Sequence, residues 1–207
     1  LGERIEHASA RRRRRLSRDL QVIFQDPFAS LNPSIPVGDT LAEPLHAQGV
    51  AGRDARRRVV DLLDRVALPA DAAQRLPREF SGGQRQRIAI ARALAIGPKL
   101  IVCDEPVSAL DLTTQRTVLD LLLEIQEQTG VAYLFISHDL SVVRYMSHRV
   151  NVIHRGRIVE SGDGGQVTTT PRHAYTQRLL LSAPVADPVL QRARRAALDR
   201  RRAEGNA

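Results

Sequence analysis

The chain has 207 residues, of which 43% are hydrophobic and 26% are charged. This size and balance allow one sizeable globular domain, or a domain with an appendage. A single cysteine excludes a disulfide framework within the chain and suits a reducing compartment. No apolar run of the sequence approaches the ~20 residues that a membrane-spanning helix needs.

The formal net charge is +8, and every basic residue except Lys99 is an arginine. An excess of positive charge is typical of proteins that bind nucleic acid or anionic lipid. Here the arginines concentrate at 11–15 and in the tail over 192–202, outside the segments with the clearest structural patterns. No aromatic residue for base stacking lies within either run. We therefore interpret both runs as solvated charge and expect no nucleic-acid partner.

Hydrophobic periodicity predicts helices and strands that alternate along most of the chain. Val59, Leu62, Leu63 and Val66, for example, follow the i, i+3, i+4, i+7 spacing of one helix face. Two continuous apolar runs, within 99–106 and 131–139, predict strands buried on both faces of a parallel sheet. The predicted elements in chain order are a strand at 20–24, helices at 37–46, 53–66 and 82–96, a strand within 99–106, a helix at 112–128, a strand within 131–139, a helix at 140–147, a hairpin over 149–162 that turns at Arg155-Gly156, and a helix within 171–181.

Strand–helix–strand alternation predicts an α/β fold with a parallel sheet, in which chemistry lies beyond the carboxyl ends of the strands. Gln25, Asp104, Glu105 and His138 all follow predicted strands. Adjacent carboxylates suit the binding of Mg²⁺ and the orientation of a water. For each of these residues taken alone, a structural role at a strand end is the more common one.

A second group of candidate residues begins the helix predicted at 82–96. Ser81, Gly82, Gly83 and Gln84 place flexible residues before it, and the N–H groups and dipole of a helix N-terminus attract anions. An ordinary N-cap with a glycine loop is the structural alternative.

Together and in this order, the segments resemble an ATP-binding cassette ATPase, the nucleotide-binding subunit of ABC transporters. "FSGGQRQRIAIARAL" resembles the signature motif, "LIVCDEP" the Walker B strand with its catalytic glutamate, "SALD" the D-loop and "LFISHDL" the switch-histidine region. "VIFQDPFASLNP" resembles the Q-loop of dipeptide and oligopeptide importers, and "TPRHAYTQRLLLSAPVADP" resembles their C-terminal extension, with Ala174 where the family usually has proline. The resemblance covers about 20–188. Importers of nickel and other small ligands share this cassette type, which leaves the cargo open.

The resemblance implies ATP and Mg²⁺ as cofactors and assigns roles to the residues at the strand ends. Asp104 would support Mg²⁺, and Glu105 would polarise the attacking water. His138 would contact the γ-phosphate. Gln25 would sense the γ-phosphate and, through a water, the metal, and would relay this to the transmembrane subunits.

The resemblance also implies a dimer of cassettes. Ser81 to Gln84 would bind the γ-phosphate of an ATP held by the opposite cassette, and the D-loop from Ser108 to Asp111 would lie at the interface. Further implied partners are transmembrane permease subunits and, indirectly, a solute-binding protein. The implied location is peripheral, at the cytoplasmic face of the cell's inner membrane.

The implied fold is a partial RecA-like P-loop NTPase core with an inserted helical subdomain and a C-terminal extension. Its expected segments are a basic lead-in (1–19), the Q-loop strand and loop (20–30), the helical subdomain with the signature motif (31–96), the Walker B, D-loop and switch-histidine part of the core (97–160), the importer-type extension (161–190) and a basic tail (191–207).

One expected motif is absent from the sequence. A P-loop has the form G-x-x-x-x-G-K-[ST], but Lys99, the only lysine, follows Gly97-Pro98 directly before the Walker B strand. In the family the P-loop lies upstream of the Q-loop, and its strand lies in the sheet beside the Walker B and switch-histidine strands. We therefore expect an N-terminally truncated sequence with open strand edges, unable to hydrolyse ATP alone.

The leading hypothesis is an ATPase subunit that energises import of peptides or related small solutes. One alternative is a non-catalytic partner cassette that donates its signature motif to an intact cassette. A second is a soluble ABC ATPase that acts on DNA or ribosomes, which the importer-like Q-loop and extension disfavour.

Overall fold

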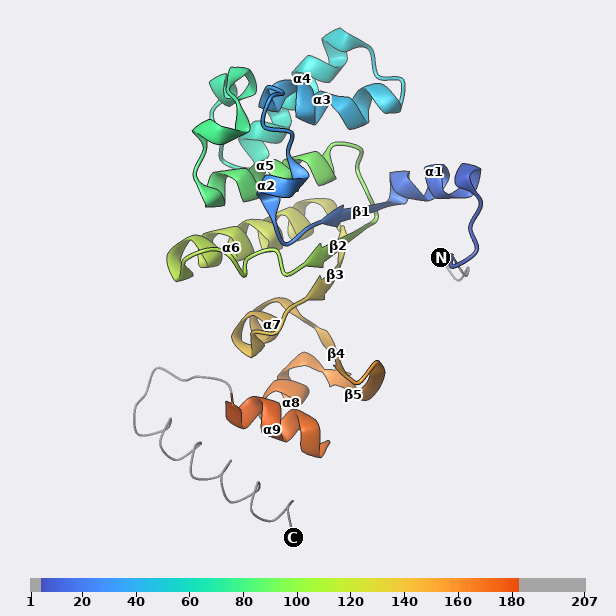
Figure 1. The fold of residues 1–207 in the computed structure, drawn as a ribbon, viewed down its shortest axis with the longest axis vertical. Helices are drawn as coiled ribbons and strands as arrows, with labels where there is room; N and C mark the ends of the chain where they lie inside the picture. The colour runs from blue at the N-terminus through green and yellow to red at the C-terminus, as the bar shows by residue number, and fades with distance from the viewer. Residues whose placement is uncertain (1–4, 183–207) are drawn as a thin grey trace. The chain divides into compact units, whose positions relative to one another are not determined.

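The computed structural model of this protein describes residues 5–182, which form two compact units (Figure 1). The first unit ends at Ile136 and contains a parallel sheet with helices. The second starts at Ser137 and contains an antiparallel hairpin with short helices. The expected segment boundaries within these units stay predictions.

The sheet of the first unit has three parallel strands in the order β1-β2-β3. They are β1 (Leu20–Ile23), β2 (Leu100–Asp104) and β3 (Ala132–Ile136). In register, Ile23 lies opposite Cys103, and Asp104 lies opposite Ile136. The predicted α/β fold with a parallel sheet is therefore confirmed, and the carboxyl ends of all three strands meet at one edge.

The prediction that both later strands are buried on two faces is wrong. In β2, Ile101 and Cys103 are fully buried, but the alternate positions are only half-buried. In β3, Leu134 is 53% exposed and Ile136 is 46% exposed. Val22, Val102 and Leu134 are partners in register, so the exposed positions lie on one face of the sheet, and the other described residues do not fully cover that face. Among the described residues β1 and β3 each pair only with β2, so each has one edge without a strand partner.

The thiol of Cys103 has no contact with solvent, and burial raises its pKa to about 12. The thiolate is the reactive species, so the native thiol is both inaccessible and protonated at neutral pH. We expect Cys103 to resist iodoacetamide at pH 8 in the native protein and to be labelled completely in denaturant, as mass spectrometry of the two samples would show. Rapid native labelling would contradict the packing of β2.

The first unit contains the four helices that the sequence predicts between β1 and β3. α4 buries Val59, Leu62 and Leu63, the face that the periodicity indicates. The long α6 ends at Gly130, whose φ of 70° is the left-handed conformation that glycine adopts without strain at a helix end. The bounds are α3 (Val37–Ala47), α4 (Gly52–Arg65), α5 (Gly82–Leu94) and α6 (Leu112–Thr129).

The first unit also contains helices that the sequence analysis does not predict. α1 (Ala10–Asp19) carries the run 11–15 and buries no residue, which agrees with solvated charge. The Ser9 hydroxyl caps α1 by accepting a hydrogen bond from Arg12 N–H. The others are the single turn α2 (Pro27–Ser30) and the 3₁₀ helices η1 (Ala70–Gln74) and η2 (Pro77–Glu79).

The second unit is built around the predicted hairpin. Arg155 and Gly156 form its turn with φ values of 50° and 75°, the positive pair that a tight two-residue hairpin turn requires. Val150, Val152 and Val167 form its core. Its elements are α7 (Leu140–Met146), β4 (Arg149–His154), β5 (Arg157–Asp163), α8 (Gly164–Thr169), which the sequence analysis does not predict, and α9 (Ala174–Ser182).

The start of the expected C-terminal extension is held to this hairpin. The Glu160 carboxylate on β5 accepts hydrogen bonds from the N–H groups of Arg172 and His173, at 2.8 and 3.1 Å. The rings of His154 and Tyr175 stack with centroids 3.9 Å apart. Residues 183–190 of the expected extension and the basic tail at 191–207 lie outside the described residues. Over 5–182, no helix is both long and apolar enough to cross a membrane.

Candidate functional site

The structure brings together two of the predicted site residues at the carboxyl edge of the sheet. Gln25 lies two residues beyond β1, and Glu105 comes directly after β2. The Gln25 Nε2 donates a hydrogen bond to Glu105 Oε2 at 3.3 Å. Because β1 and β2 are parallel neighbours, residues that are 80 positions apart in the sequence meet at the same edge.

The backbone at Glu105 has an unusual conformation. Its φ of 45° lies in the left-handed region, which costs a non-glycine residue ~1–3 kcal/mol and is found most often at functional sites. The Glu105 N–H donates to Ile136 O at 3.0 Å, so pairing with the end of β3 holds this conformation. The Glu105 carbonyl accepts from the N–H and the hydroxyl of Ser108, which closes the turn that follows.

Asp104 is half-buried at the last position of β2, next to Glu105. Within residues 5–182, no three His, Cys, Asp or Glu side chains are grouped to hold a metal by themselves. Mg²⁺ usually binds one or two carboxylates together with waters and substrate phosphates, not a cage made of protein alone. The donors present therefore fit a Mg²⁺ that arrives with a phosphate ligand.

The predicted anion site at the start of α5 has a complete capping box. The Ser81 hydroxyl accepts from Gln84 N–H at 3.3 Å, and Gln84 Oε1 accepts from Ser81 N–H at 2.9 Å. The structural alternative, an N-cap, is thus present in this structure. Helix geometry offers no intrahelical acceptor to the N–H groups of Gly82 and Gly83, which are the donors suited to an external anion.

Gly83 is required by a close approach between two helices. A Cβ atom at this position would lie 2.2 Å from Thr114 Cγ2 on α6, closer than any side chain tolerates.

Thr114 also binds the predicted D-loop residue Asp111, the N-cap of α6. Asp111 accepts from Thr114 N–H at 3.0 Å and from its hydroxyl at 2.6 Å. Both hydrogen bonds lower the pKa of Asp111, and the bond from the Thr114 hydroxyl has the larger effect. Thr114, which the sequence analysis missed, therefore connects the signature loop with the D-loop.

His138 belongs to the second unit, two residues after β3 ends. Its neighbour Asp139 is the N-cap of α7 and accepts a hydrogen bond from Ser141 N–H at 2.7 Å. The contact with the γ-phosphate that the resemblance implies for His138 stays a prediction.

Solved structures of ATP-binding cassettes have a similar fold. One is cbiO1 from Clostridium perfringens, part of the ABC transporter complex cbiONQ, with a TM-score of 0.71 and 27% identity over 77% of this chain and 62% of that one. Another is a dimeric cassette in a post-hydrolysis state bound to ADP and Pi, with a TM-score of 0.65 and 27% identity over 76% of this chain and 68% of that one.

Two relatives have a higher sequence identity to this chain than these solved structures do. The oligopeptide transport ATP-binding protein OppD of Mycobacterium tuberculosis is 52% identical over 188 residues, which are 91% of this chain and 31% of that protein. The glutathione import ATP-binding protein GsiA of Escherichia coli is 52% identical over 198 residues, 95% of this chain and 32% of that one. The chain thus spans about a third of the length of these relatives. The family model described as ABC transporter matches residues 2–108, just over half of the sequence, and this chain therefore belongs to the ABC transporter family.

Proposed function

We propose that this chain is the part of an ATPase subunit that energises import of peptides or related small solutes across the cytoplasmic membrane. The observation that carries the proposal is the contact between Gln25 and Glu105 at the carboxyl edge of the sheet. The names of its relatives, which refer to oligopeptide transport and glutathione import, support the class of cargo. The subunit binds peripherally to permease subunits at the cytoplasmic face and acts indirectly with a solute-binding protein.

In this proposal the residues at the sheet edge divide the chemistry of hydrolysis. Glu105 orients and polarises the attacking water and accepts its proton at the carboxylate. Gln25 holds that carboxylate through its amide, and His138 contacts the γ-phosphate. Asp104 supports Mg²⁺, which when bound neutralises charge that develops on the phosphates.

The signature loop serves a second cassette. The N–H groups of Gly82 and Gly83, with Ser81 and Gln84, face the γ-phosphate of an ATP held by the opposite cassette, where a helix N-terminus favours the negative charge. The D-loop from Ser108 to Asp111 lies at the interface between the cassettes.

The sequence 1–207 contains no P-loop, so we expect residues 1–207 alone to be inactive. A partner cassette that is itself non-catalytic is a second candidate function. The capping box at Ser81 is compatible with it, since the signature helix begins correctly in residues 1–207 without a P-loop. Under this alternative Ser81 to Gln84 remain essential for ATP turnover at the intact cassette, and Glu105 is not essential.

The test of the cargo class is solute-stimulated ATP hydrolysis by the assembled transporter, purified from cells that make this chain and reconstituted in vesicles. Short peptides or glutathione, presented with the solute-binding protein, are expected to stimulate turnover several-fold. Stimulation by duplex DNA instead, weakening with salt, would favour the soluble nucleic-acid ATPase.

A further inference from the structure

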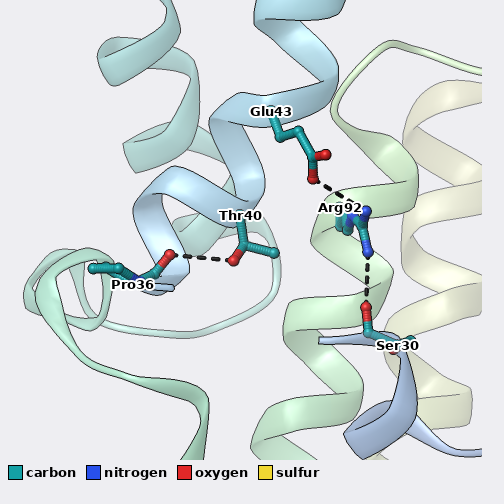
Figure 2. A network of polar contacts seen from close by, with 5 residues as sticks. All are labelled: Ser30, Pro36, Thr40, Glu43 and Arg92. Atoms are coloured by element: carbon teal, nitrogen blue, oxygen red, sulfur yellow. Dashed lines mark hydrogen bonds and ion pairs between the residues drawn. The ribbon is translucent and has the colours of Figure 1, made fainter. Parts of the chain in front are cut away.

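One arginine of the signature helix joins three separate segments of the first unit. The Arg92 Nη1 on α5 donates to the carbonyl oxygen of Ser30 at 2.8 Å, and its Nη2 pairs with Glu43 Oε2 on α3 at 3.2 Å (Figure 2). Ser30 is 62 residues away in the sequence and is the last residue of α2, in the loop that Gln25 begins.

The bond to Ser30 is the stronger of the two contacts. Carbonyls at the end of a helix lack intrahelical partners, and a guanidinium N–H is a charged donor for them. The Arg92 side chain is 38% exposed, whereas that of Glu43 is 69% exposed, so solvent weakens the ion pair. A planar guanidinium has separate nitrogens for the two acceptors, which a lysine ammonium cannot reproduce.

These contacts fix the loop at both of its ends. Gln25 is bound to Glu105, and five residues later Ser30 is bound to Arg92. Pro27 lies between them and restricts the backbone, so the short segment has little freedom to absorb a shift. Arg92 in turn lies on the same continuous helix that begins at Ser81 with the signature residues.

We propose that Arg92 is a positioning residue that couples the Gln25 loop to the signature helix. A shift of Gln25 on contact with nucleotide passes through Ser30 to Arg92 and so to α5. This role in turnover rests on the proposed function, but the anchoring of the loop does not.

Hydrogen exchange tests the anchoring without any nucleotide. In Arg92→Ala, we expect amides over 25–35 to exchange about tenfold faster than in the unaltered protein, because the charged hydrogen bond is lost. Arg57→Ala is the matched control, since it removes an arginine ion pair confined to α4 (Arg57 to Asp54) and leaves the loop unchanged. Equal exchange of the loop in Arg92→Ala and in the unaltered protein would overturn the proposal.

Turnover by the assembled transporter tests the coupling. Arg92→Ala is expected to lower kcat about tenfold with KM for ATP unchanged, and to add less than about twofold in a Gln25→Ala background. A purely structural role would give independent, additive losses, and additive losses would overturn the proposal.

If Arg92→Ala fails to fold, Arg92→Lys replaces it in both experiments, with the same non-additivity expected. If the unaltered transporter shows no ATP turnover, the proposed function fails, and the exchange result alone decides on Arg92.

Discussion

Replacing Glu105 with glutamine is expected to lower ATP turnover by the assembled transporter at least about a hundredfold, because a general base contributes about 10²–10⁴ to such a rate. Glutamine keeps the size of the side chain and an oxygen that can still accept the bond from Gln25. The variant therefore loses the basic carboxylate while keeping the geometry of the sheet edge.

The measurement is the steady-state rate of phosphate release at saturating Mg²⁺-ATP, together with a melting curve that confirms folding. Glu127→Gln is the matched control, because Glu127 is an exposed glutamate on α6. Unchanged turnover in Glu105→Gln would remove Glu105 from catalysis. If Glu105→Gln kept its turnover but Ser81→Ala lost it, a non-catalytic partner cassette would explain the results better.

Gly83→Ala is expected to destabilise the first unit and to abolish ATP-dependent pairing of cassettes. The added methyl group would meet Thr114 Cγ2 at 2.2 Å, so either Thr114 must rotate and lose its hydroxyl bond to Asp111, or α5 and α6 must move apart. Overpacking of this kind costs ~1–3 kcal/mol, and a movement of α5 would displace the N–H groups that we propose bind the phosphate. The measurements are thermal unfolding and ATP-dependent dimerisation by analytical ultracentrifugation.

Two further variants show whether the clash is the cause. Gly82→Ala adds a methyl group 3.6 Å from Leu110 Cδ2, an ordinary contact, so its melting temperature is expected to change little. Thr114→Ser removes the clashing methyl group and keeps the hydroxyl that binds Asp111, so it should restore stability to Gly83→Ala. Failure of this rescue would contradict the packing explanation.

Local patterns were sufficient for most elements and for the placement of Gln25 and Glu105 after strands. The strand at Leu20–Ile23 and the turn at Arg155-Gly156 depend on neighbouring residues, and both are present. The meeting of Gln25 with Glu105 follows from the rule that parallel strands end at one edge. α1 was missed because its arginines carry no apolar period, although arginine itself favours helices.

Other features depend on contacts that no local pattern encodes. The exposure of Leu134 is set by which elements cover its face of the sheet, not by the apolar sequence of β3. The contacts of Thr114 with Gly83 and of Arg92 with Ser30 join distant segments through packed helices, so neither residue type nor spacing indicates them.

We expect residues 1–207 to supply the Q-loop, Walker B and signature parts of an ATP site but not its phosphate loop. The most direct test is ATP turnover by this chain alone with Mg²⁺, and again after addition of an intact cassette that carries a P-loop. We predict no turnover by the chain alone and ATP-dependent association with the intact cassette. Turnover by the chain alone that Glu105→Gln abolishes would contradict the claim.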